Sequence, residues 1–256
     1  MYLLELQNVS KSYGKLEAVS DLSFAVQAGS IHSLIGPNGA GKTTVFNVIT
    51  GADRPSSGKV FFRGEEITRL QPHEVAKKGI SRSFQQTFLF MRYTVLENVL
   101  VGFHMHKRAG AVREFLHTRA ARAAERQIVD RALEIIDLMG LYPYRHELAC
   151  NLAHGHQRAL GVSIALACEP TLLLMDEPVT GMNPTECDEM VARILKIRDE
   201  RITVLLVEHS MRVVMSISDR ITVMSYGRKI AEGTPTEVRS DRRVIEAYIG
   251  EEGDVA

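Results

Sequence analysis

Hydrophobic and polar residues alternate in the opening segment of the chain. The alternation runs through LLELQNVSKSYG and again through VSDLSFAVQAG, which predicts strands joined by turns. SIHSLIG is a short apolar run typical of a buried strand. It leads through a glycine-rich loop into a predicted helix, TTVFNVIT, which ends at Gly51. SSGKVFFRGEEI predicts a further pair of strands with glycine turns.

The pattern changes between residues ~95 and 165, where the chain is rich in Ala, Arg and Leu and has helical character, as in RAARAAERQIVDRALEIIDLMG. Strands and helices alternate again afterwards, as in TLLLMDE, ECDEMVARILKIRDE and ITVLLVEHS, which predicts βα units with parallel strands. We therefore expect one α/β domain over residues 1–250. Its core, with a β subdomain, comprises 1–94 and 166–250, a helical subdomain is inserted at ~95–165, and 251–256 form a tail.

Composition narrows the possible functions. The chain has 256 residues, 45% of them hydrophobic, and 31 basic residues balance 31 acidic ones, so the net charge is +0. Such a chain can form a packed core, and the balance argues against general nucleic-acid binding. Arginines in the helical segment could form a nucleic-acid stripe or a solvated helix face with glutamate partners, and we favour the second interpretation. They are residues 108, 113, 119, 122, 126 and 131, with partners such as Glu114, Glu125 and Glu134.

Cysteine spacing and apolar run lengths point to the cytoplasm. Cys150, Cys168 and Cys187 show no CxxC spacing, which predicts free thiols in a reducing compartment. The opening residues are too polar for a signal peptide, and ITVLLV and TLLLM are far shorter than the roughly 20 residues that span a bilayer. We expect a soluble, cytoplasmic chain that acts at a membrane only through partners.

GPNGAGKT, from Gly36 to Thr43, fits the phosphate-loop pattern G-x-x-x-x-G-K-[ST] and lies between a predicted strand and a predicted helix. Glycines allow backbone N–H groups to point at phosphate oxygens, and the helix N-terminus adds positive potential. Lys42 would face the outer phosphates, and the Thr43 hydroxyl would bind magnesium. The predicted nucleotide-binding residues are Gly36, Pro37, Asn38, Gly39, Ala40, Gly41, Lys42, Thr43 and Thr44.

Two acids follow the apolar strand TLLLM at the predicted carboxyl edge of the sheet, where ligands bind in open α/β folds. Asp176 fits the carboxylate that reaches magnesium, directly or through water. Glu177 could position and polarise a water that attacks the γ-phosphate, since positioning matters more than base strength in phosphoryl transfer. The alternative for Glu177 is a helix cap or a surface acid.

Five further segments, VSKSYG, SRSFQQ, MDEP, GMNP and LLVEHS, resemble the nucleotide-binding subunits of ABC transporters, and the resemblance covers nearly the whole chain. It implies that Tyr13 stacks on adenine. It implies Gln85, or Gln86 as second choice, as the glutamine on the magnesium side of the nucleotide, which is also the transmission residue of the family. His209, which follows a buried strand, is implied to contact the γ-phosphate.

The same resemblance assigns GMNP, from Gly181 to Pro184, to the loop that faces the other subunit, with Asn183 in place of the usual Asp. A pair of subunits that closes over two ATP molecules is thereby implied. Asp176 and Thr43, together with Gln85, form the implied magnesium site. ATP and Mg²⁺ are the expected cofactors.

LAHGH occupies the family signature, usually L-S-G-G-Q: Leu152, Ala153, His154, Gly155 and His156. In the family this loop covers the γ-phosphate of the partner's ATP with backbone N–H groups, a Ser hydroxyl and a helix N-terminus. Ala153 lacks the hydroxyl, and the two imidazoles could offset that loss when charged. A metal site is disfavoured, because two histidines at i and i+2 point apart on a helix and no third ligand is evident.

The best match is to the LivG-type ATPases of the branched-chain and hydrophobic amino-acid uptake family, through ISRSFQQTFLFMRYTVLENVLVG, EPVTGMNP, VEHSMRVVMSISDRITVMSYGRKIAEGTP and VIEAYIGE. The resemblance implies an importer ATPase bound to the inner face of the cell membrane. Implied partners are a second ATPase subunit, identical or different, two permease subunits and a solute-binding protein, with no nucleic acid. Urea, amide or aromatic-acid importers use similar subunits, so the cargo stays open.

Two other function classes are considered. A soluble ABC ATPase of DNA repair or translation needs a long coiled coil or tandem halves, which the chain lacks. A weakly hydrolytic, nucleotide-sensing subunit is suggested by the altered signature. Near TFLFMRYTVLENV, Phe88 and Phe90 either line a groove for a helix of the membrane subunit or belong to a local core.

Overall fold

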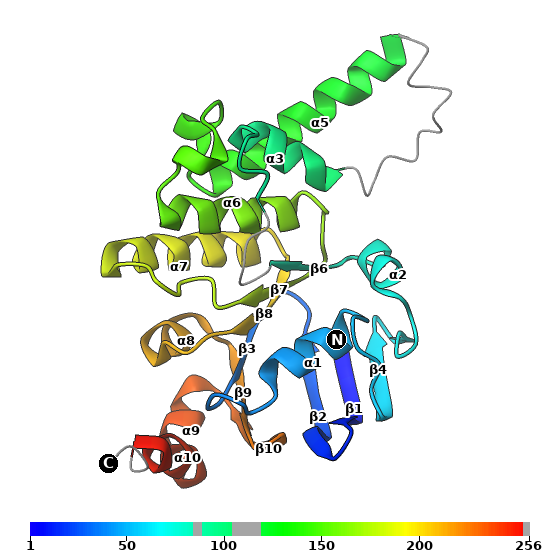
Figure 1. The fold of residues 1–256 in the computed structure, drawn as a ribbon, viewed down its shortest axis with the longest axis vertical. Helices are drawn as coiled ribbons and strands as arrows, with labels where there is room; N and C mark the ends of the chain where they lie inside the picture. The colour runs from blue at the N-terminus through cyan, green and yellow to red at the C-terminus, as the bar shows by residue number, and fades with distance from the viewer. Residues whose placement is uncertain (84–88, 104–118, 253–256) are drawn as a thin grey trace. The chain divides into compact units, whose positions relative to one another are not determined.

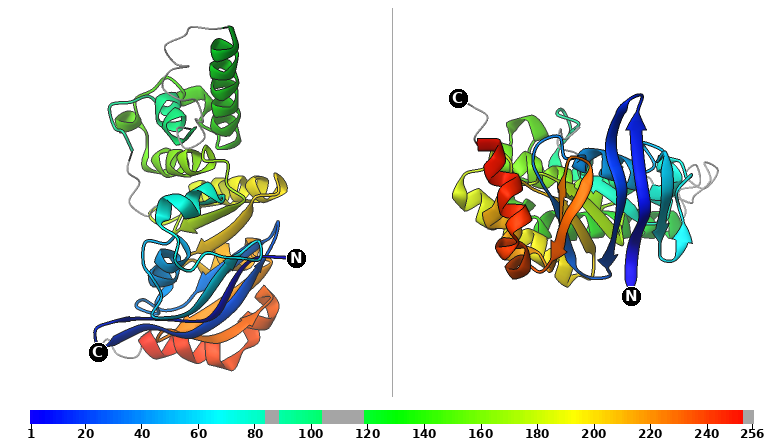
Figure 2. Two further views of the ribbon diagram at one scale, coloured as in Figure 1. Left: turned by 90° about the vertical axis from the view of Figure 1, so that its right-hand side faces the viewer. Right: turned by 90° about the horizontal axis from the view of Figure 1, so that it is seen from below.

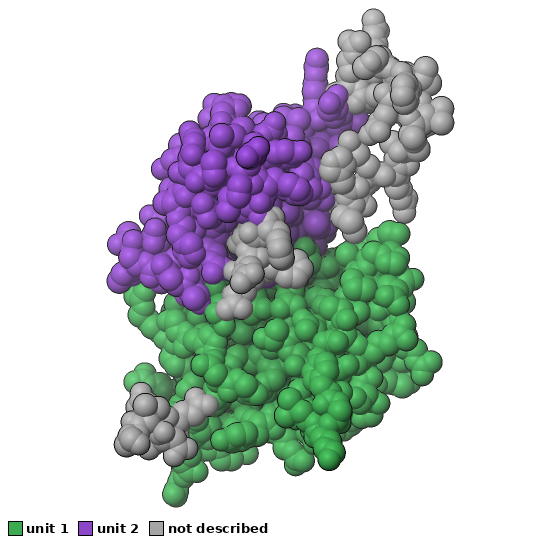
Figure 3. Space-filling model, viewed as in Figure 1, with its two compact units in different colours: residues 1–82, 171–177, 197–256 green, residues 83–170, 178–196 purple. Residues whose placement is uncertain are grey.

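The computed structural model describes residues 1–83, 89–103 and 119–252. The chain divides into two compact units, coloured separately in Figure 3. The first unit comprises residues 1–82, 171–177 and 197–256 and contains the predicted phosphate loop, so it is called the nucleotide-binding unit. The helical unit comprises residues 83–170 and 178–196.

The strands form two sheets. The antiparallel four-stranded sheet has the order β2-β1-β4-β5, and its long strands β1 and β2 stand out in Figure 2. The six-stranded sheet has the order β10-β9-β3-β8-β7-β6, with parallel pairing among β9, β3, β8 and β7 and antiparallel pairing of β10 with β9. The strands are β1 Tyr2–Tyr13, β2 Leu16–Gln27, β3 Ile31–Ile35, β4 Ser57–Phe62, β5 Glu65–Glu66, β6 Ile80–Ser83, β7 Leu172–Asp176, β8 Thr203–Val207, β9 Arg220–Ser225 and β10 Arg228–Gly233.

The described helices are as follows: α1 Lys42–Ile49, α2 Pro72–Lys77, α3 Val95–Gly102, α5 Arg119–Leu138, α6 His154–Leu166, α7 Pro184–Asp199, α8 Met211–Ile217, α9 Pro235–Ser240 and α10 Arg242–Glu252, with 3-10 turns η2 at Tyr142–Tyr144 and η3 at Ala149–Asn151. Their order along the chain can be followed in Figure 1. None of these described helices has the length and apolar character needed to cross a membrane.

Three central strands place the site. Every residue of β3, β7 and β8 is buried, as expected for parallel strands covered on both faces. Because these strands are parallel, their carboxyl ends lie at one edge of the sheet. The phosphate loop follows β3 there, Asp176 ends β7, and His209 lies just after β8. The predicted α/β architecture with an antiparallel N-terminal sheet is thus confirmed.

The helical unit contains α3, α5 and α6, which pack on one another. A capping box starts α3: the Thr94 hydroxyl accepts the Glu97 N–H at 3.2 Å, and the Glu97 carboxylate accepts the Thr94 N–H at 2.7 Å. On α5, Arg131 pairs with Glu134 at 2.6 Å, and both side chains are at least half exposed. This pair agrees with the solvated-face interpretation of the arginine-rich segment.

Candidate nucleotide-binding site

Two glycines of the phosphate loop lie where no side chain fits. A Cβ on Gly36 would be 2.0 Å from the Met224 carbonyl oxygen of β9, and a Cβ on Gly41 would be 2.4 Å from the Ala18 carbonyl oxygen of β2. Both glycines have positive φ, 151° and 100°. The loop is therefore pressed against two strands, which fixes its curvature where it turns into α1.

The Lys42 side chain lies along the inside of this loop. Its Nζ donates to the carbonyl oxygens of Gly36 at 2.6 Å and Pro37 at 2.8 Å, and the residue is only 6% exposed. A buried ammonium needs such acceptors to offset its lost hydration. The contacts hold the cation inside the loop, against two of its carbonyl oxygens. The neighbouring Thr43 side chain is exposed.

Asp176 at the end of β7 is hydrogen-bonded to an arginine that has no assigned role in the sequence motifs. The Arg82 guanidinium of β6 donates from Nη2 to Asp176 Oδ2 at 2.7 Å and from Nη1 to Asn47 Oδ1 at 2.8 Å. Its carbon Cζ lies 5.3 Å from the centre of the Phe46 ring. Arg82 and Asp176 side chains are 11% and 5% exposed, so the pair is shielded from solvent.

Tyr13 at the end of β1 is 44% exposed, and the Asp53 carboxylate connects it by hydrogen bonds to Asn47 of α1. Its hydroxyl donates to Asp53 Oδ2 at 2.6 Å, which also accepts from Asn47 Nδ2 at 3.2 Å. The hydrogen bond raises the pKa of Tyr13 and lowers the pKa of Asp53. Lys11 Nζ lies 4.7 Å from the Tyr13 ring centre. The ring is thus fixed beside the phosphate loop, with open surface for stacking.

Glu177 and His209 form a direct contact at the sheet edge. His209 Nε2 is 2.9 Å from Glu177 Oε1, and their side chains are 39% and 16% exposed. Glu177 has a φ of 50°, which is uncommon for a residue with a side chain and is typical of functional sites. The buried Glu208 carboxylate accepts the N–H groups of His209 at 2.8 Å and Ser210 at 3.1 Å. Glu208 thereby fixes the backbone that carries the histidine.

The oxygen donors at this edge suit magnesium. Asp176 supplies a carboxylate and Thr43 a hydroxyl, both hard ligands, while Mg²⁺ in nucleotide sites takes few protein ligands besides phosphates and waters. Within the described part of the chain, no cluster of three or more His, Cys, Asp or Glu could hold a metal ion.

The signature loop belongs to the helical unit. Ala153 is the N-cap of α6 and gives no side-chain cap, so no hydroxyl accepts from the first-turn N–H groups. Ala153 and His154 are exposed, whereas the His156 ring lies 4.5 Å from the Tyr144 ring. Gln157 Nε2 donates to the Leu152 carbonyl at 3.1 Å and ties the loop to α6. Backbone donors of the loop are thus presented by a helix start without a capping side chain.

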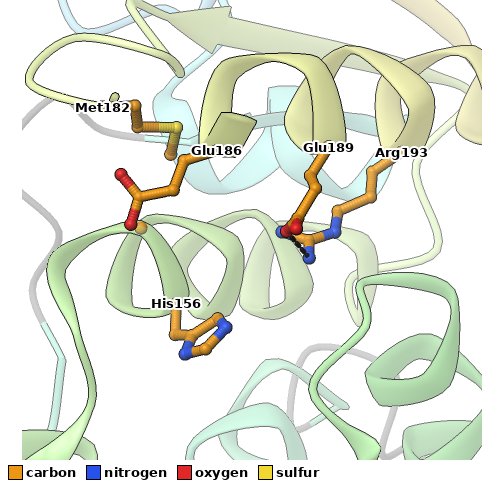
Figure 4. Close-up of a pocket in the computed structure, with 6 residues that line it drawn as sticks. His156, Met182, Glu186, Glu189 and Arg193 are labelled. Carbon is orange, nitrogen blue, oxygen red and sulfur yellow. Dashed lines mark hydrogen bonds and ion pairs between the residues drawn. The ribbon is translucent and has the colours of Figure 1, made fainter. Parts of the chain in front are cut away.

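Asn183 and Glu186 form a reciprocal cap at the start of α7. Glu186 N–H donates to Asn183 Oδ1 at 3.0 Å, and Asn183 N–H donates to Glu186 Oε2 at 3.0 Å. Asn caps helices as well as Asp does, which accounts locally for the departure from the usual Asp. A Cβ on Gly155 would lie 3.0 Å from Glu186 Oε1, so Glu186 lies close to the first turn of α6. Figure 4 shows Glu186 above the start of α6, in a pocket that Glu189 and Arg193 also line.

The predicted residues divide between the two units. In the nucleotide-binding unit lie Tyr13, Gly36, Pro37, Asn38, Gly39, Ala40, Gly41, Lys42, Thr43, Thr44, Asp176, Glu177 and His209. In the helical unit lie Leu152, Ala153, His154, Gly155, His156, Gly181 and Asn183. Gln85, its alternative Gln86 and Phe88 lie outside the described residues. Sequence reasoning missed Arg82, Asn47 and Asp53; the N-x-x-E spacing at Asn183 could have revealed the α7 cap.

Comparisons with known proteins identify the family of the chain. The profile of the ABC transporter family matches residues 19–180, and that of the branched-chain amino acid ATP-binding cassette transporter matches residues 228–254. The high-affinity branched-chain amino acid transport ATP-binding protein BraF of Pseudomonas aeruginosa is 41% identical over 97% of this chain and 98% of its own.

Two solved structures show the same fold. The ADP conformation of an ATP-binding cassette of an ABC transporter superposes with a TM-score of 0.85 at 31% identity, covering 98% of this chain and 99% of the other. A dimeric bacterial ABC transporter cassette superposes with a TM-score of 0.76 at 26% identity, covering 91% of this chain and 99% of the other.

Proposed function

Because the chain belongs to the ABC transporter family, as an ATP-binding cassette, we propose that it is the ATP-hydrolysing subunit of an importer for branched-chain or other hydrophobic amino acids. The observation that supports hydrolysis is the contact of 2.9 Å between Glu177 and His209. It lies at the edge of the sheet where the phosphate loop follows β3. A subunit that only sensed nucleotide would not need this pair, so the contact favours hydrolysis over the sensing alternative.

ATP binds along one edge of the nucleotide-binding unit in this proposal. Tyr13 stacks on the adenine, and a stacked base is typically worth about 1–3 kcal/mol. The loop from Gly36 to Thr44 surrounds the phosphates with backbone N–H groups at the start of α1, where the helix dipole favours negative charge. Lys42 exchanges its two carbonyl acceptors for phosphate oxygens, so the ammonium stays paired throughout.

Glu177 holds the attacking water in line with the γ-phosphate, and its left-handed backbone aims the carboxylate. His209 Nε2 lies at this carboxylate, and the same N–H would donate to the γ-phosphate once ATP is bound, so the histidine links the water-positioning group and the phosphate. Thr43 and Asp176 would hold Mg²⁺, and Gln85 is the further proposed ligand. When bound there, the ion would stabilise negative charge on the leaving phosphates.

Two subunits pair head to tail in the proposed cycle. The loop from Leu152 to His156 then covers the γ-phosphate of the partner's ATP with the first-turn N–H groups of α6. His154 is exposed and can add an imidazole donor where Ala153 lacks the hydroxyl. The Gly181–Asn183 turn, tied to α7 by Glu186, faces the same partner. The dimeric related cassette supports this pairing.

The membrane partners bind the helical unit. The Phe90 and Tyr93 rings stack with their centres 5.3 Å apart, and the two residues are 48% and 47% exposed. Met91 and Leu148 are also exposed. Backbone hydrogen bonds join the segment with Met91 and Tyr93 to the segment after Leu148, so these exposed side chains are neighbours. This exposure favours a docking surface over a local core for Phe90. We assign it to a helix of a permease subunit, which places the chain at the cytoplasmic face of the membrane beside two permeases and a solute-binding protein.

The test is leucine uptake by cells that lack the gene for this chain. Restoring the wild-type chain is expected to restore uptake, and Glu177→Gln is expected to lower uptake and ATP turnover at least 100-fold while the variant still binds ATP, since only the water-positioning group is lost. Glu200→Gln changes an exposed acid of the same unit and serves as the matched control.

Competition with unlabelled isoleucine, phenylalanine, urea and acetamide then identifies the cargo class. Normal turnover by Glu177→Gln would refute its assigned role. Uptake restored for urea or acetamide but not for leucine would refute the amino-acid assignment while leaving the ATPase intact.

A further inference from the structure

Arg82 donates to the acid at the centre of the proposed magnesium site, and the geometry points to a function for it that the sequence motifs do not contain. We propose that Arg82 is a positioning residue: it orients the Asp176 carboxylate toward the magnesium side of the nucleotide, and Asn47 in turn holds Arg82. The proposal rests on the proposed ATPase function. It concerns the affinity for Mg²⁺ in the presence of the nucleotide and not whether ATP itself binds.

Arg82 is held at both ends of its guanidinium. Nη2 donates to Asp176 Oδ2 at 2.7 Å, Nη1 donates to Asn47 Oδ1 at 2.8 Å, and the planar group lies against Phe46. At 11% exposure, it is screened little by solvent. Because Arg presents its donors in a rigid fork, two fixed acceptors determine the plane of the guanidinium. That plane determines the rotation of the Asp176 carboxylate.

The anchor of Arg82 belongs to α1, the helix that follows the phosphate loop. Asn47 lies on α1, one turn after Thr43, and its amide Nδ2 donates to Asp53, which accepts from Tyr13. A continuous polar chain thus connects the proposed adenine-stacking ring with the acid that ends β7. The chain lies entirely in the nucleotide-binding unit. Arg82 therefore places Asp176 relative to α1, the element that carries the other proposed magnesium ligand.

Orientation and charge make opposite predictions for the loss of Arg82. If Arg82 orients Asp176, its loss leaves a carboxylate free to rotate, and such supporting partners typically contribute about 10–100-fold to metal affinity. If Arg82 acts only through its positive charge, its loss would remove a repulsive cation and strengthen Mg²⁺ binding. The fixed geometry at both Nη atoms favours orientation.

The experiment measures binding of a non-hydrolysable ATP analogue to the purified full-length chain by calorimetry, first in EDTA and then over a Mg²⁺ titration. Arg82→Met is expected to raise about 10-fold the Mg²⁺ concentration at which half of the gain in analogue affinity is reached. The affinity for the analogue in EDTA is expected to change less than twofold. Arg82→Lys keeps the charge without the fork and is expected to give about a 3-fold increase. Asn47→Ala keeps Arg82 but removes its anchor, and a similar increase of about 3-fold is expected.

Arg63→Met is the matched control, because Arg63 also lies over a phenylalanine, Phe62, at 5.4 Å and donates from Nη2, to Thr171, away from the loop. Its Mg²⁺ requirement should match the wild type. A folded Arg82→Met with an unchanged or lowered requirement overturns the proposal. Should Arg82→Met not fold, an unchanged requirement in Asn47→Ala overturns it. A wild-type chain that binds no analogue under any condition overturns the proposed function as well.

Discussion

The phosphate loop and the signature loop both start a helix, yet their surroundings differ. The phosphate loop is pressed against β2 and β9 at two glycines, and its lysine is buried. The signature loop starts α6 without a side-chain cap, and Ala153 and His154 are exposed. One loop is fixed by its own unit, whereas the other presents donors outward. In the proposed dimer, this contrast separates the half of the ATP site that one subunit would complete from the half that a second subunit would complete.

The largest effect is expected where the phosphate loop touches a strand. Gly36→Ala would put a Cβ 2.0 Å from the Met224 carbonyl oxygen, at a backbone angle that residues with side chains rarely adopt. Strain and overpacking each cost about 1–3 kcal/mol, so we expect a loss of about 4 kcal/mol in unfolding free energy. ATP binding should also be lost, because the loop must move away from β9. Urea unfolding and calorimetry measure the two effects.

Gly39→Ala provides the matched control. Gly39 has a φ of 77°, but among the described residues no atom beyond its two chain neighbours lies within 4 Å of the position that a Cβ would take. Only the backbone conformation is penalised, at about 1–2 kcal/mol. Equal losses for the two variants would show that the strand contact does not shape the loop, and the contrast between the two loops would then fail.

Much of the fold and of the phosphate site could be predicted because their motifs lie in short, continuous stretches of sequence. G-x-x-x-x-G-K-[ST] between a strand and a helix, and an apolar strand ending in Asp176, each depend on local sequence. The carboxyl ends of the two strands, β3 and β7, lie at the same edge of the sheet. Arg82 could not be identified, because its partners Asn47 and Asp176 are 35 and 94 residues away. The left-handed backbone of Glu177 also had no local signal, since glutamate does not favour it.

A histidine that the nucleotide-binding unit buries completely is expected to cause the next largest effect. His32 in β3 is 0% exposed; its Nε2 lies 2.9 Å from the Thr222 hydroxyl, and no hydrogen-bond partner of Nδ1 is found among the described residues. Burial lowers the pKa of His32 from 6.5 to about 4. The unfolded chain therefore takes up this proton near pH 6.5 and the folded chain only near pH 4, so stability is lost as pH falls between these values. The loss is about 3 kcal/mol.

His32→Gln retains a group that can pair with Thr222 but does not titrate. Its unfolding free energy should fall less between pH 7 and pH 4.5 than that of the wild type, whatever its value at pH 8. Carboxylates titrate in both proteins, so the difference between the two urea-unfolding series isolates His32. Parallel series would show that burial of His32 does not cause the acid sensitivity.

The smallest effect tests the other loop. Ala153→Ser places a hydroxyl at the N-cap of α6, where it can accept the His156 N–H, and caps of this kind typically contribute about 1 kcal/mol. We expect a stability gain of that size and slower exchange of the His156 amide hydrogen. Ala153→Val offers no acceptor and should show neither change. If Ala153→Ser gives no gain, the first-turn N–H groups are satisfied within the subunit, and the signature loop would then be as complete as the phosphate loop, which contradicts the difference drawn between them.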